Sequence, residues 1–189
     1  MTNIYFVRHA QSDYTVHDDM KRPLTKKGMC DRALVSEFLE SKGVSVVISS
    51  PYKRAYDTVA EFAQLNNLAI ICMDKFKERQ IADIWINDFD AYSRAQWSDF
   101  SYKLSSGESL GDVQSRNIEA LCEVLETYPN ETIVVGTHGT ALSTIVNYFD
   151  KTFTYENFAA IVGLMPWIVH FQFDGNTCVH IDSINPFDL

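Results

Sequence analysis

Short, continuous apolar runs mark the predicted strands of this chain. The runs are rich in β-branched and aliphatic residues, and each is too short for a helix. A strand without polar alternation is typical of a sheet that is covered on both faces. The pattern therefore predicts strands at residues 3–8, 44–49, 68–73 and 132–137.

Between these runs, apolar residues recur at helical spacing. The spacing predicts helices within residues 24–43, 50–66, 110–128 and 139–149. Thr25 is the expected N-cap of the first helix, and Gly43 is its expected stop. Ser50 is the expected cap of the second helix, where Pro51 suits the first helical position.

Two stretches depart from the alternation of strand and helix. Residues 165–181 predict a hairpin that turns at Asp174-Gly175. Residues 74–107 are rich in Asp, Trp, Tyr and Ser and hold one weak helical pattern, so we expect an excursion above the sheet. The whole pattern favours a single α/β domain over residues 1–189, a three-layer α/β/α sandwich with helices on both faces of a mostly parallel central sheet.

Composition and charge narrow the range of partners. Apolar residues make up 46% of the 189 residues and charged residues 22%, as in soluble globular proteins. A net charge of −9 argues against nucleic acid or an anionic membrane as a partner, because both need a basic stripe. The pairs Lys21-Arg22 and Lys26-Lys27 are interpreted as solvated surface. No signal peptide or membrane span is predicted.

The cysteines indicate the compartment. The four cysteines are Cys30, Cys72, Cys122 and Cys178. They are far apart, form no C-x-x-C pair and fall in apolar stretches, so we interpret them as reduced core residues of a cytoplasmic protein. A disulfide between two of them is the alternative.

Charged and titratable residues follow three of the predicted strands, at the ends where α/β sheets bind their ligands. The first strand ends in Arg8 and His9, and His138 follows the fourth. Ser49-Ser50-Pro51 follows the second, with Arg54 in the first turn of the next helix. If these strands are parallel, two arginines and two histidines converge on one rim.

Such a rim suits a phosphate group. Guanidinium forks match a tetrahedral phosphate and keep their charge. Their charge lowers the pKa of a histidine between them, so the ring stays neutral and nucleophilic. Taken singly, each residue has a structural interpretation: Arg54 pairs with Asp57 or Glu61 on its own helix, or His138 is a core histidine.

The remaining histidines lack such company. His17, His170 and His180 are therefore interpreted as structural. The chain contains no H-x-H, no H-E-x-x-H and no clustered Cys/His spacing, so neither a metal nor another cofactor is expected.

Six segments follow one another along nearly the whole chain in an order that carries a resemblance. They are VRHAQS (7–12), PLTKKG (23–28), SSPYKRAYDTVA (49–60), FKERQIADIW (76–85), GESLGDVQSR (107–116) and VVGTHGTAL (134–142). Together they resemble the motifs of the histidine phosphatase superfamily, branch 1, the phosphoglycerate-mutase-like group. The resemblance implies that fold, with residues 74–107 as a lid over the active site.

The resemblance also implies a role for each residue at the rim. His9 would attack phosphorus in line and become a phosphohistidine, while Arg8, Arg54 and His138 would hold the phosphoryl oxygens. Glu78 would protonate the leaving oxygen and then deprotonate the water that hydrolyses the phosphoenzyme.

Further positions in the motifs have other implied roles or differ from the family pattern. Asp83 is the competing acid, but its spacing matches the motif less well. Ser12 is expected to add a hydroxyl to the phosphate pocket, and Thr15 stands where many relatives have an asparagine that contacts phosphate. Glu108 is expected to begin a helix rather than to react. Ala10 replaces the usual glycine after the histidine.

The implied activity is the hydrolysis of a small phosphate ester without a metal. One alternative is phosphoglycerate-mutase-type phosphoryl transfer, whose enzymes usually carry longer insertions over the site. The other is a non-catalytic phosphate-binding protein on the same fold. Hydrolysis is favoured because the four rim residues are all present and the excursion is compact. The sequence indicates neither the substrate nor the oligomeric state.

The expected lid is aromatic. Its aromatic residues are Phe76, Trp85, Phe89, Tyr92, Trp97, Phe100 and Tyr102. They either line a pocket wall or form a small core of their own. Lys77, Arg79 and Lys103 either meet a second anionic group of the substrate or face solvent.

Overall fold

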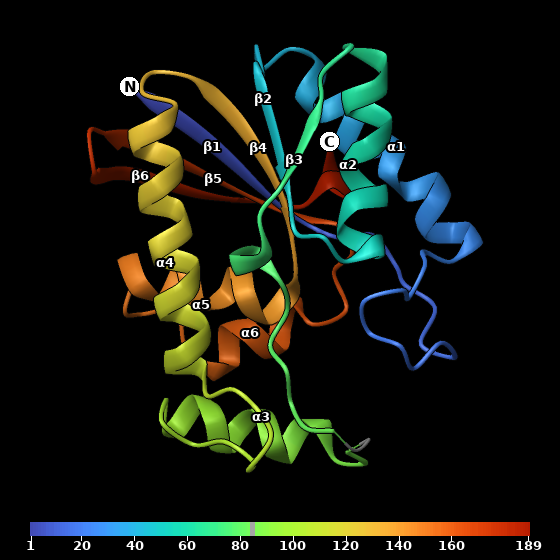
Figure 1. The fold of residues 1–189 in the computed structure, drawn as a ribbon, viewed down its shortest axis with the longest axis vertical. Helices are drawn as coiled ribbons and strands as arrows, with labels where there is room; N and C mark the ends of the chain where they lie inside the picture. The colour runs from blue at the N-terminus through green and yellow to red at the C-terminus, as the bar shows by residue number, and fades with distance from the viewer. Residues whose placement is uncertain (84–85) are drawn as a thin grey trace.

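The strands of the computed structural model, which describes residues 1–83 and 86–189, form one twisted sheet (Figure 1). In the described part of the chain the sheet has six strands in the order β3-β2-β4-β1-β5-β6. Their bounds are β1 Thr2–Arg8, β2 Val46–Ser49, β3 Ile70–Cys72, β4 Thr132–Thr137, β5 Trp167–Asp174 and β6 Thr177–Ile184. The first four strands are parallel, β5 is antiparallel to β1, and β6 is antiparallel to β5 at the edge of the sheet. The predicted mostly parallel sheet and the C-terminal hairpin are confirmed.

Helices cover both faces of this sheet. The helices are α1 Lys26–Glu40, α2 Lys53–Leu65, α3 Phe89–Ser98, α4 Leu110–Thr127, α5 Gly139–Phe149 and α6 Tyr155–Ile161. One face carries α1 and α2, and the other carries α4 and α5, so the predicted three-layer sandwich is confirmed. Figure 1 places α3 and α6 beyond the ends at which β1 and β4 finish.

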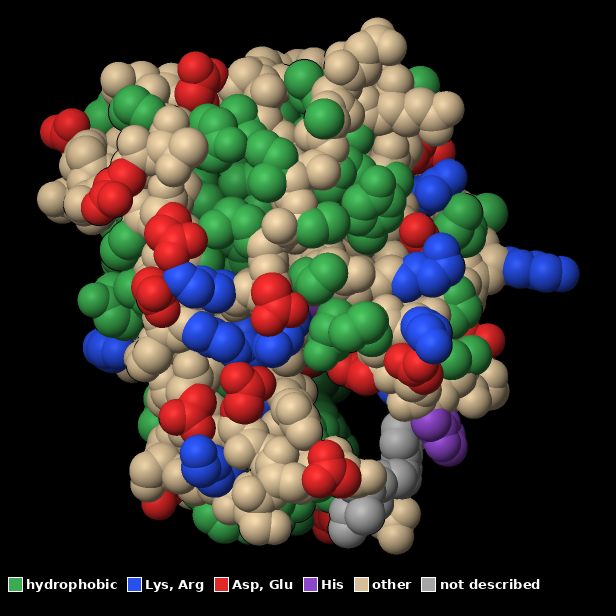
Figure 2. All heavy atoms as spheres, viewed as in Figure 1, with side chains coloured by type: hydrophobic (Ala, Val, Ile, Leu, Met, Phe, Trp, Pro, Cys, Tyr) green, Lys and Arg blue, Asp and Glu red, His purple; other side chains and the backbone are tan. Residues whose placement is uncertain are grey.

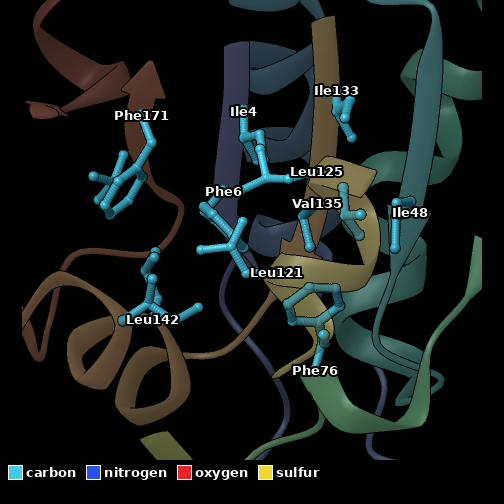
Figure 3. Packing of buried hydrophobic residues seen from close by; sticks show 14 of the residues in the cluster. Ile4, Phe6, Ile48, Phe76, Leu121, Leu125, Ile133, Val135, Leu142 and Phe171 are labelled. Carbon is cyan, nitrogen blue, oxygen red and sulfur yellow. The ribbon is translucent and has the colours of Figure 1, made fainter. Parts of the chain in front are cut away.

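The alternation of side chains along β1 builds a core on each face of the sheet. Ile4 and Phe6 point to one face, where they pack with Leu121 of α4 and Leu142 of α5 (Figure 3). Tyr5 and Val7 point to the other face, in the cluster formed with α1 and α2. Because side chains of a strand alternate between faces, this uninterrupted apolar run anchors β1 on both sides.

The ends of the elements agree with the sequence in part. The Thr25 hydroxyl accepts from the Gly28 amide and caps α1 as predicted. The predicted cap at Ser50 is wrong: α2 begins at Lys53, with Tyr52 as its N-cap residue. The Ser50 hydroxyl instead accepts from the Tyr52 amide in the turn before the helix. Helix α6 was not predicted, because its seven residues are too few to show a helical repeat.

The hairpin turns one residue later than predicted. Asp174 is still paired with Thr177 as the last residue of β5, and the turn consists of Gly175 and Asn176. Gly175 has a φ of 55°, in the left-handed region that glycine adopts without a steric penalty.

The excursion 74–107 begins with a 3-10 turn, Asp74–Phe76, and continues to α3. Phe76 was expected in the lid but is fully buried in the main core, edge-on to Phe6. The Trp97 ring packs beside Phe158, so α3 lies against α6. Most of the described lid aromatics therefore form contacts among themselves or with neighbouring elements, whereas Trp85 lies outside the described residues.

The structure corrects the predicted exposure of several cysteines and of Arg22. Cys30, Cys72 and Cys122 are exposed, so the expectation that they lie in the core is wrong, whereas Cys178 is half-buried and packs against the core; all four thiols are free. Arg22 is buried, which corrects its assignment to solvated surface.

On the face shown in Figure 2, lysines and arginines are interspersed with acidic residues and form no basic stripe. No helix in the described ranges is both long and apolar enough to cross a membrane.

Candidate active site

The register of the parallel strands brings the predicted rim residues together. Arg8 pairs with Thr137 across β1 and β4, and the His9 amide donates to the Thr137 carbonyl at 3.1 Å. As a result the rings of His9 and His138 lie 5.4 Å apart, centroid to centroid. The convergence expected from parallel strands is therefore present.

His9 has one unprotonated ring nitrogen. Its Nδ1 lies 2.7 Å from the Ala10 carbonyl oxygen, which only accepts hydrogen bonds, so Nδ1 carries the proton. Nε2 is then unprotonated, and it accepts from Arg54 Nε at 3.2 Å. The Ala10 amide donates to the Thr58 hydroxyl, which fixes this turn to α2.

Burial and positive charge both favour the neutral form of His9. Its pKa lies well below 6.5, first because the ring is buried and then because Arg54 and Arg8 are close. Arg22 adds a further cation to this field. The ring therefore remains uncharged near neutral pH.

His138 stands at the start of α5 and is buried. Its Nε2 and the Ser50 hydroxyl oxygen are 2.8 Å apart, and the Tyr52 ring lies edge-on at 5.3 Å. Burial, Arg54 and His9 lower the pKa of His138 well below 6.5. Its Nδ1 is buried and has no hydrogen-bond partner among the described residues.

The Arg8 guanidinium is held by the end of α6. Nη1 donates to the carbonyls of Ile161 at 2.6 Å and Leu164 at 3.0 Å, and Nη2 donates to Val162 at 2.9 Å. Carbonyls at the C-terminal end of a helix attract a cation. A Cβ on Gly139 would lie 2.9 Å from Arg8 Nε, so glycine is needed for this approach. Nε itself is buried and has no partner in the described ranges.

Arg54 links His9 to the loop between β1 and α1. Besides the bond to His9, its Nη1 donates to the Asp19 carbonyl, and its Nη2 lies 3.2 Å from the Asp19 carboxylate. The interpretation of Arg54 as a partner of Asp57 or Glu61 does not hold, since Asp57 pairs with Lys53 and Glu61 with Arg32.

Glu78 reaches the same rim from the excursion. Its carboxylate accepts from the amides of Thr140 at 3.0 Å and Ala141 at 3.1 Å, in the first turn of α5. Thr140 and Ala141 are two and three residues beyond His138. Asp83 is exposed, and its contacts are with Gln80 and Ser106. Of the two candidate acids, the structure brings only Glu78 to α5.

An arginine that was not predicted holds the segment that carries Glu78. Arg116 of α4 donates to the backbone carbonyls of Lys75, Lys77 and Glu78 and forms a two-pronged ion pair with Glu108. Glu108 precedes the N-cap of α4, Ser109, and its second partner is the Gln80 amide. Burial alone raises the pKa of Glu108, but the Arg116 and Gln80 bonds lower it overall. In the sequence, the signal for this ion pair is the spacing of Glu108 and Arg116, which lie about two helical turns apart.

The two hydroxyl candidates differ. Ser12 is buried, and its hydroxyl has no hydrogen-bond partner in the part of the chain that the structure describes. Thr15 is exposed, and its hydroxyl donates to Asp13 at 2.7 Å within its own loop. Of the two hydroxyls, only that of Thr15 is already paired among the described residues.

The cations of the excursion have other partners. Lys77 pairs with Asp74 and Lys103 with Asp112, both at the surface. Arg79 is buried, stacks on the rings of Phe89 and Tyr92 and donates to Gln96. Burial lowers the pKa of Arg79. Arg79 thus ties α3 to the Glu78 segment, a role that was not predicted.

Comparison with known proteins identifies the class. The sequence model of the histidine phosphatase superfamily (branch 1) matches residues 4–180. The chain belongs to this family, and it is an enzyme of the phosphatase class.

Individual relatives agree with the family. The uncharacterized phosphatase PhoE of Bacillus subtilis is 25% identical over 150 residues, 77% of this chain and 76% of its own. Phosphoserine phosphatase 1 of Hydrogenobacter thermophilus is 28% identical over 155 residues, 73% and 71% of the two chains. The solved structure of Bacillus stearothermophilus YhfR covers 97% of this chain and 96% of its own with a TM-score of 0.81 and 23% identity, which shows the shared fold.

Proposed function

We propose that this phosphatase hydrolyses a small phosphorylated metabolite, without a metal, through a phosphohistidine at His9. The observation that carries the proposal is the His9 ring, whose Nδ1 is held by the Ala10 carbonyl while Nε2 faces the Arg54 guanidinium. A neutral ring whose unprotonated nitrogen lies beside a fixed cation is suited to attack an anionic phosphoryl group.

The reaction has two steps. In the first, the His9 Nε2 lone pair attacks phosphorus, the P–O ester bond breaks, and the leaving oxygen takes a proton from the Glu78 carboxyl. In the second, water attacks phosphorus and gives its proton to Glu78, and the P–N bond breaks to release phosphate. Arg8 and Arg54 neutralise the charge on the phosphoryl oxygens in both steps, and the uncharged His138 ring donates a hydrogen bond to them.

The position of Glu78 supports its part in this scheme. Its carboxylate lies at the first turn of α5, two residues beyond His138. It is also close enough to Arg8 for its charge to raise the pKa of that guanidinium. The segment 74–107 that carries Glu78 is proposed to cover the site. Ser12 is proposed as a further phosphate contact because its buried hydroxyl is unpaired among the described residues.

The substrate class and the compartment follow from separate observations. The name of phosphoserine phosphatase 1, one of the relatives, supports a small phosphate ester as the substrate. Four free thiols, three of them exposed, suit a reducing compartment, so we place the protein in the cytoplasm.

Phosphate release tests the activity. The purified protein should release inorganic phosphate from p-nitrophenyl phosphate in excess EDTA, and His9→Ala should abolish the release. A screen of sugar phosphates, phosphoglycerates, nucleotides and phosphopeptides then identifies the substrate. Interconversion of 3- and 2-phosphoglycerate with little phosphate release would show a mutase instead.

A further inference from the structure

The loop between β1 and α1 carries a buried arginine that the reaction above does not use. Only 8% of the Arg22 side chain is exposed, whereas the neighbouring Lys21 side chain is 81% exposed. Arg22 Nε donates to the Val16 carbonyl at 2.9 Å, and the guanidinium lies 5.1 Å from the centre of the Tyr14 ring. A guanidinium is buried at a high cost unless an anion accompanies it.

The anion that accompanies Arg22 is shared with the active site. Asp19 Oδ1 lies 2.9 Å from Arg22 Nη1 and 3.2 Å from Arg54 Nη2. Arg54 in turn donates to the nucleophilic nitrogen of His9. One carboxylate oxygen therefore sits between two buried guanidinium groups beside the proposed phosphoryl site.

Only the anion of this group reaches solvent. The Asp19 side chain is 42% exposed, but those of Arg22 and Arg54 are 8% and 3% exposed. If the carboxylate leaves, water can solvate it, while the two arginines remain buried and need another anion. Phosphate oxygens match paired guanidinium groups as well as a carboxylate does.

The loop does not need the carboxylate to stay in place. The backbone carbonyl of Asp19 accepts from Arg54 Nη1, and that of Met20 accepts from the Lys53 amide at 2.9 Å. These bonds attach the loop to the first turn of α2. The Asp19 side chain can therefore rotate away while the loop stays docked and Arg22 keeps its position.

We propose that Arg22 is a third anion-binding arginine of this site, and that Asp19 is a built-in anion that occupies the Arg22–Arg54 pair until a phosphoryl group displaces it. The proposal rests on the proposed function, in that the site takes a phosphate group. No bond is made or broken: one arginine–carboxylate contact is exchanged for an arginine–phosphate contact, and the carboxylate returns to water. Product phosphate is expelled by the reverse exchange.

Binding of inorganic phosphate to the full chain, measured by titration calorimetry, tests this exchange. Asp19→Asn removes the competing charge, so the Kd for phosphate should fall about tenfold. Asp18→Asn is the matched control, because Asp18 carries the same charge one residue away and contacts Lys21. Its Kd should stay within about twofold of the wild-type value.

The role of Arg22 is tested in the same way. Arg22→Gln should raise the Kd for phosphate about tenfold. In the double variant Asp19→Asn/Arg22→Gln, the gain from Asp19→Asn should disappear, because the freed arginine pair no longer exists. Thermal unfolding of each variant checks that the chain remains folded.

Three results overturn the proposal: a Kd for Asp19→Asn equal to or above the wild-type value, a double variant that keeps the tenfold gain, or no phosphate binding by any variant. Turnover is not needed for this measurement. If the wild-type protein binds phosphate but releases none from esters, the proposed function fails while the Asp19 exchange is still decided.

Discussion

Single residues of this site are buried together with the groups that compensate their charge. Arg8 lies against the carbonyl end of α6, Arg22 against Asp19, and Arg54 against both His9 and Asp19. Burial and the fixed cations together keep His9 neutral, so the same contacts prepare the proposed nucleophile and the proposed phosphate-binding groups.

At the residue scale, Glu78 is the group whose role is most open to test. Glu78→Gln should lower kcat/KM for an alkyl phosphate by about 10²- to 10⁴-fold, because the poor leaving oxygen needs a proton. The loss should be much smaller for p-nitrophenyl phosphate, whose leaving group is stable as an anion. Asp83→Asn is the control and should leave both rates unchanged. Equal losses on the two substrates would exclude Glu78 as the general acid.

The sequence predicted the rim residues because Arg8, His9 and His138 stand at strand ends and Arg54 stands in the first turn of the helix after a strand. It did not predict Arg22, because the pair Lys21-Arg22 carries no periodicity that separates a buried cation from an exposed one. The burial of Arg22 depends on Asp19 and Tyr14, which meet it only when the loop folds back. The prediction that Cys72 and Cys122 lie in the core was wrong because it was based on their apolar neighbours in the sequence, whereas both side chains are exposed in the fold.

At the scale of elements, the register of the parallel strands determines where the site residues meet. Pairing of Arg8 with Thr137 and of Ser49 with Gly136 aligns the ends of β1, β2 and β4. The segment that carries Glu78 has no strand of its own at this point, and Arg116 of α4 holds it through three backbone carbonyls.

Arg116 is therefore expected to position Glu78. Arg116→Gln should lower the free energy of unfolding by about 3 kcal/mol, because it leaves the half-buried Glu108 without its cation. It should also slow hydrolysis of alkyl phosphates more than that of p-nitrophenyl phosphate, as expected when the acid is misplaced. Urea unfolding and steady-state kinetics measure the two effects.

A matched control is Arg94→Gln, since Arg94 forms an exposed ion pair with Asp90 one helical turn away. It should leave stability and the ratio of the two rates unchanged. A variant of Arg116 that loses stability but slows both substrates equally would mean that Arg116 supports the fold alone.

Long, regular elements were predicted well, and short or irregular ones were not. The strand 132–137 and the helix 139–149 have the predicted bounds, since β-branched runs and helical spacing are unambiguous there. The start of α2 was misjudged because Ser50 has a second use: its hydroxyl lies beside His138. Local capping preference cannot reveal a partner that is 88 residues away.

At the scale of the whole molecule, a chain of net charge −9 has three of the buried arginines in its described part, Arg8, Arg22 and Arg54, at one rim. Figure 2 shows the molecule hollowed between α3 and the body above it, on the side of the sheet where β1 and β4 end. The site is therefore a local positive field within an acidic protein, which suits a small anion rather than an extended polyanion.

Folding stability should depend on the two buried histidines. The pKa values of His9 and His138 are well below 6.5 in the folded chain, while in the unfolded chain they are close to 6.5. Below that pH the unfolded chain binds protons that the folded chain does not, so stability falls as pH falls. Between pH 7.5 and 5.5 each histidine should cost about 1.4 kcal/mol.

Urea unfolding of the wild-type protein and of His138→Gln at both pH values measures this contribution. The variant should lose about 1.4 kcal/mol less than the wild type over the same interval, because one of the two histidines no longer takes up a proton. An identical loss in both proteins would show that His138 is protonated in the folded state.

Trapping of the phosphoenzyme is the most direct test of whether His9 is the nucleophile that accepts the phosphoryl group. Wild-type protein and Glu78→Gln are mixed with a ³²P-labelled phosphomonoester that the wild type hydrolyses, quenched in alkali and digested. A label that is stable in alkali, labile in acid and located on the His9 peptide is predicted, with none in His9→Asn. Turnover by His9→Asn at the wild-type rate, or a label on any other residue, would contradict the mechanism.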